Sequence, residues 1–155
     1  MKNIHFEENR HIATKISFGV IFLVIGCMIY LLFRSKSLNI YQWCSYLALS
    51  DIIDSLRESL RIIEPYDWIR YSLPDGLYCA SYLLIIDAIW HHEKGKVKIL
   101  VLSIVPFVTI GSEILQFFGI VKGTFDIVDL LFYVMPVLIY MTVNIINNNF
   151  KTLEL

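Results

Sequence analysis

The sequence predicts an all-α integral membrane protein: a four-transmembrane-helix bundle with an amphipathic interfacial helix between spans one and two. The composition is the first reason. The 155 residues are 57% hydrophobic and 17% charged, with a mean hydropathy of +0.63, whereas soluble proteins are roughly 45–50% apolar and about 25% charged. Four stretches are also long and apolar enough to cross a bilayer, which takes about 20 residues. We therefore expect a single membrane domain over residues 1–155.

Charge and cysteine content exclude several other classes of protein. The formal net charge is -1, which gives no electrostatic reason to expect a nucleic-acid partner. Cys27, Cys44 and Cys79 are odd in number, widely spaced and free of a C-x-x-C pattern, so they indicate neither a disulfide framework nor a zinc site. We expect no cofactor and no metal, and membrane lipids as the main partners.

The first span is expected over residues 16–33, which contain no charged residue. Its apolar core is longer than the roughly 7–15 residues of a signal peptide. The flank Arg34-Ser35-Lys36 also lacks the small residues of a cleavage site. This stretch is therefore predicted to be a retained transmembrane helix.

The long connection that follows, residues 34–72, carries the amphipathic segment. Apolar residues recur at helical spacing from Ile40 to Ile63, and charged residues cover the other side from Asp51 to Arg61. This pattern predicts one helix that ends before Pro65, because the residue before a proline disfavours helical geometry. The helix either lies in the membrane interface or folds back on the bundle.

Three more spans are expected, over residues 73–90, 97–120 and 126–146. A short loop joins the first pair, and a glycine-containing turn near Gly123 joins the second. Because short connections make neighbouring helices antiparallel, these three spans form a compact up-down unit.

Four spans place both termini on one side of the membrane. Basic residues number seven on that side and six on the other, which is almost no bias. The short basic loop at residues 94–98 favours cytoplasmic termini, since basic loops tend to remain in the cytoplasm. We expect a plasma-membrane protein in this orientation.

Polar residues inside the spans are the candidate site, because an acid at a helix centre costs roughly 2.5–3.5 kcal/mol on insertion scales. The hairpin topology brings the start of span two, the end of span three and the start of span four to one membrane face. Helical spacing puts the polar residues of each span on one stripe. We expect these stripes to line a shared pocket for a ligand. The expected members are Asp75, Tyr78 and Tyr82 from span two, Glu113 and Gln116 from span three, and Asp126, Asp129 and Tyr133 from span four.

Structural roles remain open for several of these residues. Asp75 and Asp126 stand at helix starts, where a carboxylate caps the helix. Glu113 and Asp129 could instead form a polar pair that holds two helices together. Asp87 is expected to pair locally with His91, four residues on, at the opposite membrane face. No catalytic residue is assigned.

The residues around the last turn resemble those of a known family. Glu113-x-x-Gln116, followed by Asp126-x-x-Asp129, resembles the E-x-x-Q and D-x-x-D region of VanZ-like membrane proteins, and Pro74-Asp75 resembles the family's proline–aspartate helix start. The resemblance covers residues 68–146. The chain departs from the family pattern at Lys122, where an arginine is frequent, and at residues 133–136, where asparagine and glycines are frequent.

The resemblance implies a bacterial envelope protein, since the family is named after a protein associated with low-level teicoplanin resistance. A link to glycopeptide tolerance is implied in the same way. Together with the polar stripes, it leads us to expect binding of a polar lipid headgroup or of a cell-wall precursor in a carboxylate-lined pocket. Two alternatives stay open: a membrane-embedded enzyme acting on a lipid-linked substrate, and a small proton- or ion-coupled transporter.

Overall fold

The computed structural model describes residues 2–93 and 95–153, and these residues form seven α-helices and no strand. The helices are α1 (Lys2–Phe33), α2 (Asn39–Tyr46), α3 (Ser50–Ser59), α4 (Asp67–Arg70), α5 (Ser72–Ile89), α6 (Lys96–Phe117) and α7 (Ile127–Leu153). Within the described residues, α1, α5, α6 and α7 are long and apolar enough to span a membrane. The predicted fold class, an all-α membrane protein with four spans, is confirmed.

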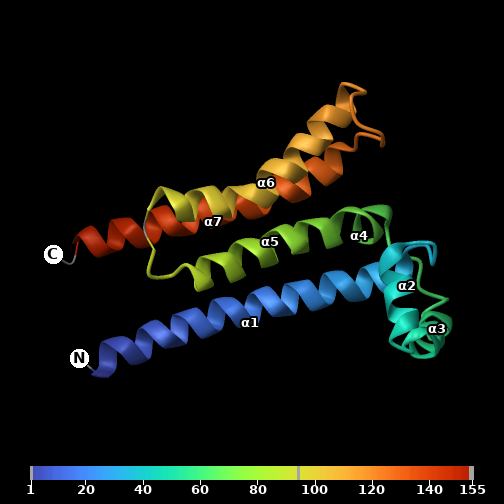
Figure 1. Cartoon of the computed structure of the whole chain (residues 1–155), viewed down its shortest axis with the longest axis horizontal. Helices are drawn as coiled ribbons and strands as arrows, with labels where there is room; N and C mark the ends of the chain where they lie inside the picture. The colour runs from blue at the N-terminus through green and yellow to red at the C-terminus, as the bar shows by residue number, and fades with distance from the viewer. Residues whose placement is uncertain (1, 94, 154–155) are drawn as a thin grey trace.

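The central helix of the bundle is α5. It packs against α1 on one side and against α6 and α7 on the other, as Figure 1 shows. The first and last described residues lie at the same end of the molecule, which we call the termini end. The opposite end, the loop end, carries α2, α3, α4 and the α6–α7 turn. Its central position explains why α5 has the largest buried share of the four spans.

Glycines allow the helices to approach closely. A Cβ atom on Gly19 of α1 would lie 2.6 Å from the Ile85 side chain of α5, and one on Gly76 of α5 would lie 2.9 Å from Phe132 of α7. Membrane helices gain most of their association energy from such close packing, because lipid supplies little hydrophobic driving force. The positions of these glycines therefore determine how α5 fits between its neighbours.

The predicted span boundaries are close to the helices, but α7 continues to Leu153, past the predicted end at residue 146, and α1 and α6 differ as well. First, α1 begins at Lys2, so the polar residues before position 16 continue the helix. Second, α6 ends at Phe117, before the predicted end at residue 120. The cause is Gly119, whose φ of 69° is left-handed. The Ile120 N–H donates to the Leu115 carbonyl at 2.9 Å, which completes a Schellman helix end.

The prediction of one continuous amphipathic helix between the first two spans is wrong. The segment forms two helices, α2 and α3, separated at Ala48, whose φ is 57°. The Leu49 N–H donates to the Cys44 carbonyl at 2.9 Å, so the first helix ends in the same way as α6. The two helices are joined by the Tyr41 hydroxyl, which donates to the Asp54 carboxylate at 2.7 Å.

The second helix of this pair folds back on the end of α1. Arg57 of α3 donates from Nε to the Leu31 carbonyl at 2.6 Å and from a terminal nitrogen to the Arg34 carbonyl at 2.8 Å. These carbonyls lie at the end of α1, where main-chain oxygens lack helical partners and the helix dipole is negative. Large apolar side chains such as Leu47 and Ile62 stay exposed, which is compatible with a place in the membrane interface.

Candidate functional site

Three carboxylates gather at the loop end, and we call Asp75, Glu113 and Asp129 the acid cluster. Asp75 lies in the first turn of α5, Glu113 near the end of α6, and Asp129 in the first turn of α7. The Asp75 carboxylate interacts electrostatically with both other carboxylates. The antiparallel order of the helices therefore brings together three acids that are 54 positions apart at most in the sequence, from 75 to 129.

Two members of the acid cluster have unfilled capacity to accept hydrogen bonds. Glu113 is 6% exposed, and its Oε2 accepts a long bond, 3.4 Å, from the Asp126 main-chain N–H. Asp129 Oδ1 is buried and has no hydrogen-bond partner among the described residues. Buried carboxylate oxygens normally have such a partner. A polar group that entered here would meet acceptors that the protein itself leaves open.

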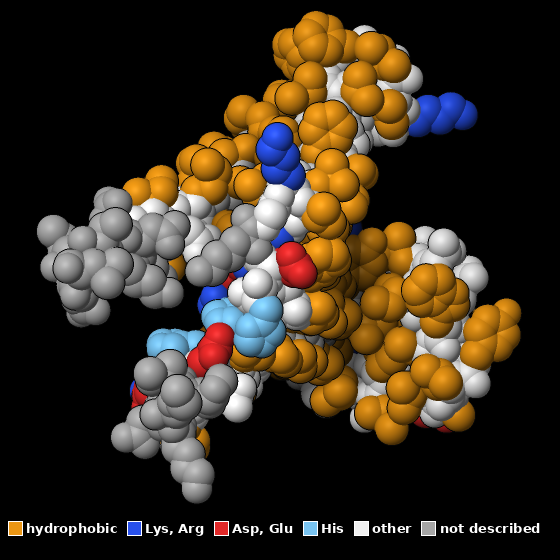
Figure 2. Space-filling view, turned by 60° about the vertical axis from the view of Figure 1, so that its left-hand side comes forward, with side chains coloured by type: hydrophobic (Ala, Val, Ile, Leu, Met, Phe, Trp, Pro, Cys, Tyr) orange, Lys and Arg blue, Asp and Glu red, His pale blue; other side chains and the backbone are white. Residues whose placement is uncertain are grey.

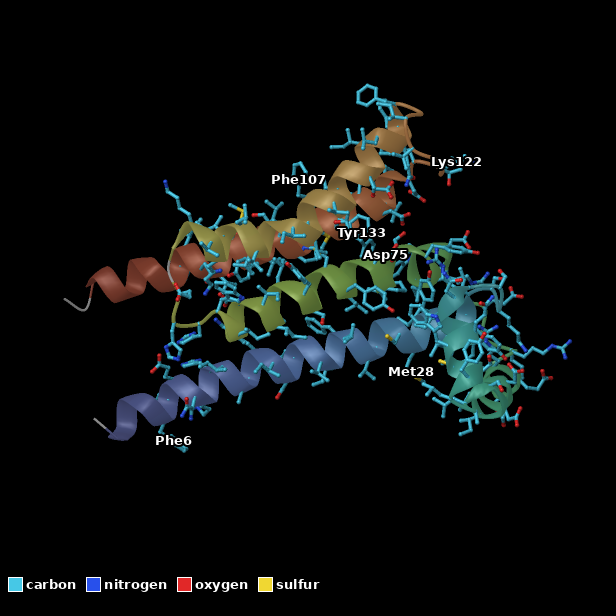
Figure 3. All side chains as sticks on the ribbon, viewed as in Figure 1. Phe6, Met28, Asp75, Phe107, Lys122 and Tyr133 are labelled. Carbon is cyan, nitrogen blue, oxygen red and sulfur yellow. The ribbon has the colours of Figure 1, made fainter. Side chains whose placement is uncertain are left out.

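Asp75 has two polar neighbours from other helices. The Tyr133 side chain of α7 lies close enough to interact with the Asp75 carboxylate, and Figure 3 shows the two residues near each other between α5 and α7. Arg34, just beyond α1, interacts with the Asp75 carboxylate electrostatically. Its guanidinium lies over the Tyr30 ring, 4.6 Å from the centroid. A positive charge therefore borders the acid cluster.

Sequence reasoning did not assign Arg34 to the site. The signal was present, because Arg34 directly follows the first span and must lie at the same membrane face as the start of the second. Topology alone could have placed this cation beside Asp75.

Asp126 and Gln116 shape the turn beside the acid cluster. Asp126 Oδ1 accepts a hydrogen bond from the Val128 N–H at 2.8 Å, so the side chain caps α7, the structural role that the sequence left open. Gln116 packs on the turn at Gly123, where an added Cβ would lie 2.7 Å from the Gln116 side chain. Both residues hold the α6–α7 turn in place.

The hydroxyls of Tyr78 and Tyr82 are directed to other helices. The Tyr78 hydroxyl donates to Cys27 Sγ of α1 at 3.3 Å. The Tyr82 hydroxyl donates to the Val101 carbonyl of α6 at 2.5 Å. Both tyrosines tie the central helix to a neighbour. Tyr82 also lies about 10 Å along α5 from Asp75, at 1.5 Å per residue.

The acid cluster does not have the arrangement of a metal site. Within residues 2–93 and 95–153, no three His, Cys, Asp or Glu side chains are placed to hold a metal ion together. The three carboxylates lie close enough to interact electrostatically, yet they do not converge on one cation.

A second polar site, which sequence reasoning missed, lies at the termini end. We call Lys15, Asp87 and Lys98 the lysine–aspartate triad. The Asp87 side chain is 5% exposed, with Lys15 Nζ 2.5 Å from one oxygen and Lys98 Nζ 2.6 Å from the other. Tyr140 of α7 also lies close enough to interact with this carboxylate. The triad joins α1, α5 and α6 at a single buried charge.

The predicted local pair between Asp87 and His91 is wrong, because each residue has a partner on another helix. His91 Nε2 instead lies 3.2 Å from Glu8 Oε1, because the helical extension of α1 brings Glu8 beside the α5–α6 loop. The position of Lys15 at the start of the first apolar stretch was the signal that could have indicated a cross-helix partner for Asp87.

Comparison of the chain with protein-family models, with curated proteins and with solved structures gave no match.

Proposed function

We propose that this membrane protein binds the polar headgroup of a lipid, or of a lipid-linked cell-wall precursor, at the acid cluster. The observation that carries the proposal is the buried Asp129 Oδ1, which has no partner among the described residues, beside the long hydrogen bond of Glu113. A hydroxyl, amide or ammonium group of a ligand would donate to these oxygens. An acid inside a membrane domain is costly, and a ligand that donates hydrogen bonds offsets this cost.

The surroundings of the acid cluster suit a headgroup. The cluster lies near the ends of three helices long enough to span a membrane, and in this proposal those ends lie at the level of the lipid headgroups. The guanidinium of Arg34 borders it, and arginine is well suited to bind a phosphate. In this proposal Arg34 holds the phosphate of the lipid, and the carboxylates accept hydrogen bonds from the remainder of the headgroup.

We also propose that the chain is a VanZ-like protein of the bacterial envelope. The residues that carry this resemblance, Glu113, Gln116, Asp126 and Asp129, surround one turn between α6 and α7, which supports a shared role for them. With cytoplasmic termini, this turn faces the outside of the cell, where cell-wall precursors and glycopeptides meet. A contribution to glycopeptide tolerance is part of the same proposal.

The test compares binding by Glu113→Gln and Asp129→Asn variants of the full chain in lipid nanodiscs. The probes are phosphatidylethanolamine, phosphatidylglycerol and a lipid-linked disaccharide–peptide precursor, with diacylglycerol as the lipid without a headgroup. We expect each variant to bind at least one headgroup about tenfold more weakly than the natural chain, because a hydrogen bond to a charged group contributes roughly 1.5–3 kcal/mol.

Glu64→Gln is the matched control, because Glu64 is exposed at the loop end and undergoes the same chemical change. It should bind all probes as the natural chain does. If both acid-cluster variants fold normally and retain full affinity for every headgroup, the proposal is wrong. If they lose affinity for diacylglycerol to the same extent, the acids have a packing role only.

A further inference from the structure

A large cavity lies at the termini end, away from the acid cluster. Its volume is about 1270 Å³, above the roughly 300–1,000 Å³ of typical small-molecule pockets. Its walls come mainly from α6 and α7, with smaller contributions from α1, α5 and the α5–α6 loop, and the acid cluster does not line it. The cavity combines a polar mouth with an apolar body, and these two parts indicate different portions of one ligand.

The apolar body follows α6 for most of its length. Lining residues of this helix recur from Lys98 to Ile114 and include Leu102, Phe107 and Ile110. These sixteen residue steps correspond to about 24 Å at 1.5 Å per residue, against roughly 30 Å for the whole hydrocarbon core of a bilayer. The body is therefore long, and it follows the axis of a spanning helix, as the acyl chain of a neighbouring lipid does.

The polar mouth has an excess of positive charge at the triad. Lys15, Asp87 and Lys98 all line the cavity, and two ammonium groups share one carboxylate. An ammonium group has three N–H donors, and each lysine uses one of them on Asp87 among the described residues. The triad thus offers two donors per lysine and one net positive charge to a ligand.

Two further acids, Glu8 and Glu93, also line the cavity near the triad. Glu8 stands two helical turns before Lys15 on α1 and is 3.2 Å from His91. Glu93 is exposed in the α5–α6 loop. Figure 2 shows acidic, basic and histidine side chains gathered at the termini end, with hydrophobic side chains covering most of the remaining visible surface. Lys98 stands one helical turn before Leu102 of the apolar body on α6, so the positive charge of the mouth lies at the triad, next to that body.

We propose that this cavity holds one phospholipid from the leaflet on the termini side. Its phosphate is bound by Lys15 and Lys98, and one acyl chain lies along α6. Charge complementarity selects this occupant. A helix of a second protein copy would place apolar side chains against the lysine donors, which is costly without a partner, whereas a phosphate accepts those hydrogen bonds. The proposal concerns a different end of the molecule from the acid cluster and does not depend on it.

The experiment uses the full chain in nanodiscs that contain phosphatidylglycerol with a photoactivatable group at the end of one acyl chain. Mass spectrometry then maps the cross-links, which we expect on α6 residues 107–114 and near Val137 of α7. Unlabelled phosphatidylglycerol should compete. Diacylglycerol with the same chains, and glycerol phosphate without chains, should each compete about tenfold less well, because each lacks one half of the ligand.

Gly111→Phe tests the apolar body. Gly111 lines the cavity, and a Cβ there would meet no described atom within 4 Å, so the new ring fills space without disturbing the fold. We expect cross-linking to fall about tenfold, which corresponds to roughly 1.4 kcal/mol. The matched control is Val108→Phe, an exposed position of the same helix that does not line the cavity, and its cross-linking should not change.

Lys98→Gln tests the mouth. It should reduce the preference for phosphatidylglycerol over diacylglycerol about tenfold, whereas Lys122→Gln, the same change at the loop end, should leave it intact. The proposal is overturned if Gly111→Phe behaves as Val108→Phe does, or if diacylglycerol competes as well as phosphatidylglycerol. It is also overturned if the chain forms a dimer that Gly111→Phe dissociates, since a second copy would then occupy the cavity. Glu113→Gln should not affect this cross-link, so the two proposals fail separately.

Discussion

The buried acids of this membrane domain are stabilised in different ways. Asp87 is neutralised by two lysines from other helices, so its charge is compensated within the protein. Glu113 accepts one long main-chain hydrogen bond, and Asp129 Oδ1 has no hydrogen-bond partner among the described residues. Removing one partner of a buried ion pair leaves an uncompensated charge and destabilises the fold. A buried acid without a partner carries this penalty already in the natural chain. This contrast supports the proposal that the acid cluster binds a ligand, whereas the Asp87 carboxylate contributes to stability.

Asp87→Asn should lower the stability of the domain by about 2 kcal/mol, because it removes a charged acceptor shared by two ammonium groups. The partial exposure of Lys15, 34% for its side chain, keeps this value below that of a fully buried pair. Thermal unfolding in detergent measures the change. The control is Asp126→Asn, which should stay within about 0.5 kcal/mol, because asparagine caps a helix as well as aspartate does. Equal stability of both variants would contradict the role of the triad.

The sequence was sufficient for part of the site. The meeting of Asp75, Glu113 and Asp129 at one end follows from short connections between antiparallel helices. The directions of the Tyr78 and Tyr82 side chains do not follow from these connections. The central helix α5 has neighbours on both sides, and the sequence does not indicate which helix each tyrosine contacts. The partners of Asp87 were missed for the same reason: Lys15 is 72 positions away, and only the packing of α1 on α5 brings it close.

At the level of helices, close glycine contacts fix the position of α5. Gly76→Ala should destabilise the domain by about 1–3 kcal/mol, because the new Cβ would lie 2.9 Å from both the ring and the main-chain oxygen of Phe132, and overfilling a tight contact has about this cost. Gly111→Ala, in open space, should instead be neutral or stabilising by up to about 1 kcal/mol. Thermal unfolding of both variants in the same detergent checks the opposite signs. If both variants lose stability, the difference in packing between Gly76 and Gly111 does not decide the effect, and this prediction is contradicted.

The break between α2 and α3 shows where helical periodicity is insufficient. Residues 40–63 contain neither glycine nor proline, and Ala48 is the best helix former of all, so no local signal indicates a break. Ala48 nevertheless adopts a left-handed conformation, which costs about 1–2 kcal/mol. The contacts that offset this cost are tertiary: Tyr41 with Asp54 between the two helices, and Arg57 with the end of α1.

The α2–α3 pair should loosen in acid. The hydrogen bond from Lys36 Nζ, followed by that from the Tyr41 hydroxyl, lowers the pKa of Asp54 below its ordinary value of 3.8. Because the folded-state pKa is the lower one, this contribution to stability is present above pH 3.8 and is lost as the pH falls through the folded-state pKa. The same partner raises the pKa of Lys36, so that contribution is lost only at strongly alkaline pH.

Hydrogen exchange of α2 and α3, corrected for the intrinsic rates, measures this effect. Protection should fall below pH 3.8 in the natural chain, while Asp54→Asn should show the lower protection already at neutral pH and little further change in acid. If the hydrogen-exchange protection of α2 and α3 in the natural chain stays the same from neutral to acidic pH, the role of Asp54 is contradicted. The four spans serve as the internal reference, because their main-chain hydrogen bonds do not involve this carboxylate.

On the scale of the whole molecule, four spans separate two polar sites with different chemistry. The acid cluster lies at the loop end and the triad at the termini end, with the apolar length of α5 between Asp75 and Asp87. Hydropathy was enough to predict the four spans. Inside a bilayer every backbone N–H and C=O group needs a hydrogen-bond partner within the protein, and a helix provides these partners within one apolar stretch. It could not predict the helical extension before residue 16, since exposed polar residues give no comparable signal and the partners there, such as His91 for Glu8, are distant in sequence.

The central claim, that the two sites face opposite sides of one membrane, is tested most directly by labelling single cysteines. Cys27, Cys44 and Cys79 are replaced, and one cysteine is placed at Lys122 or at Gly95, at opposite ends of α6; Figure 3 shows Lys122 at the far end from Phe6. An impermeant thiol reagent should label Lys122→Cys in intact cells and Gly95→Cys only after permeabilisation. Labelling of both positions in intact cells would contradict the four-span arrangement. Labelling of Gly95→Cys alone would place the acid cluster in the cytoplasm and overturn its proposed role at the envelope surface.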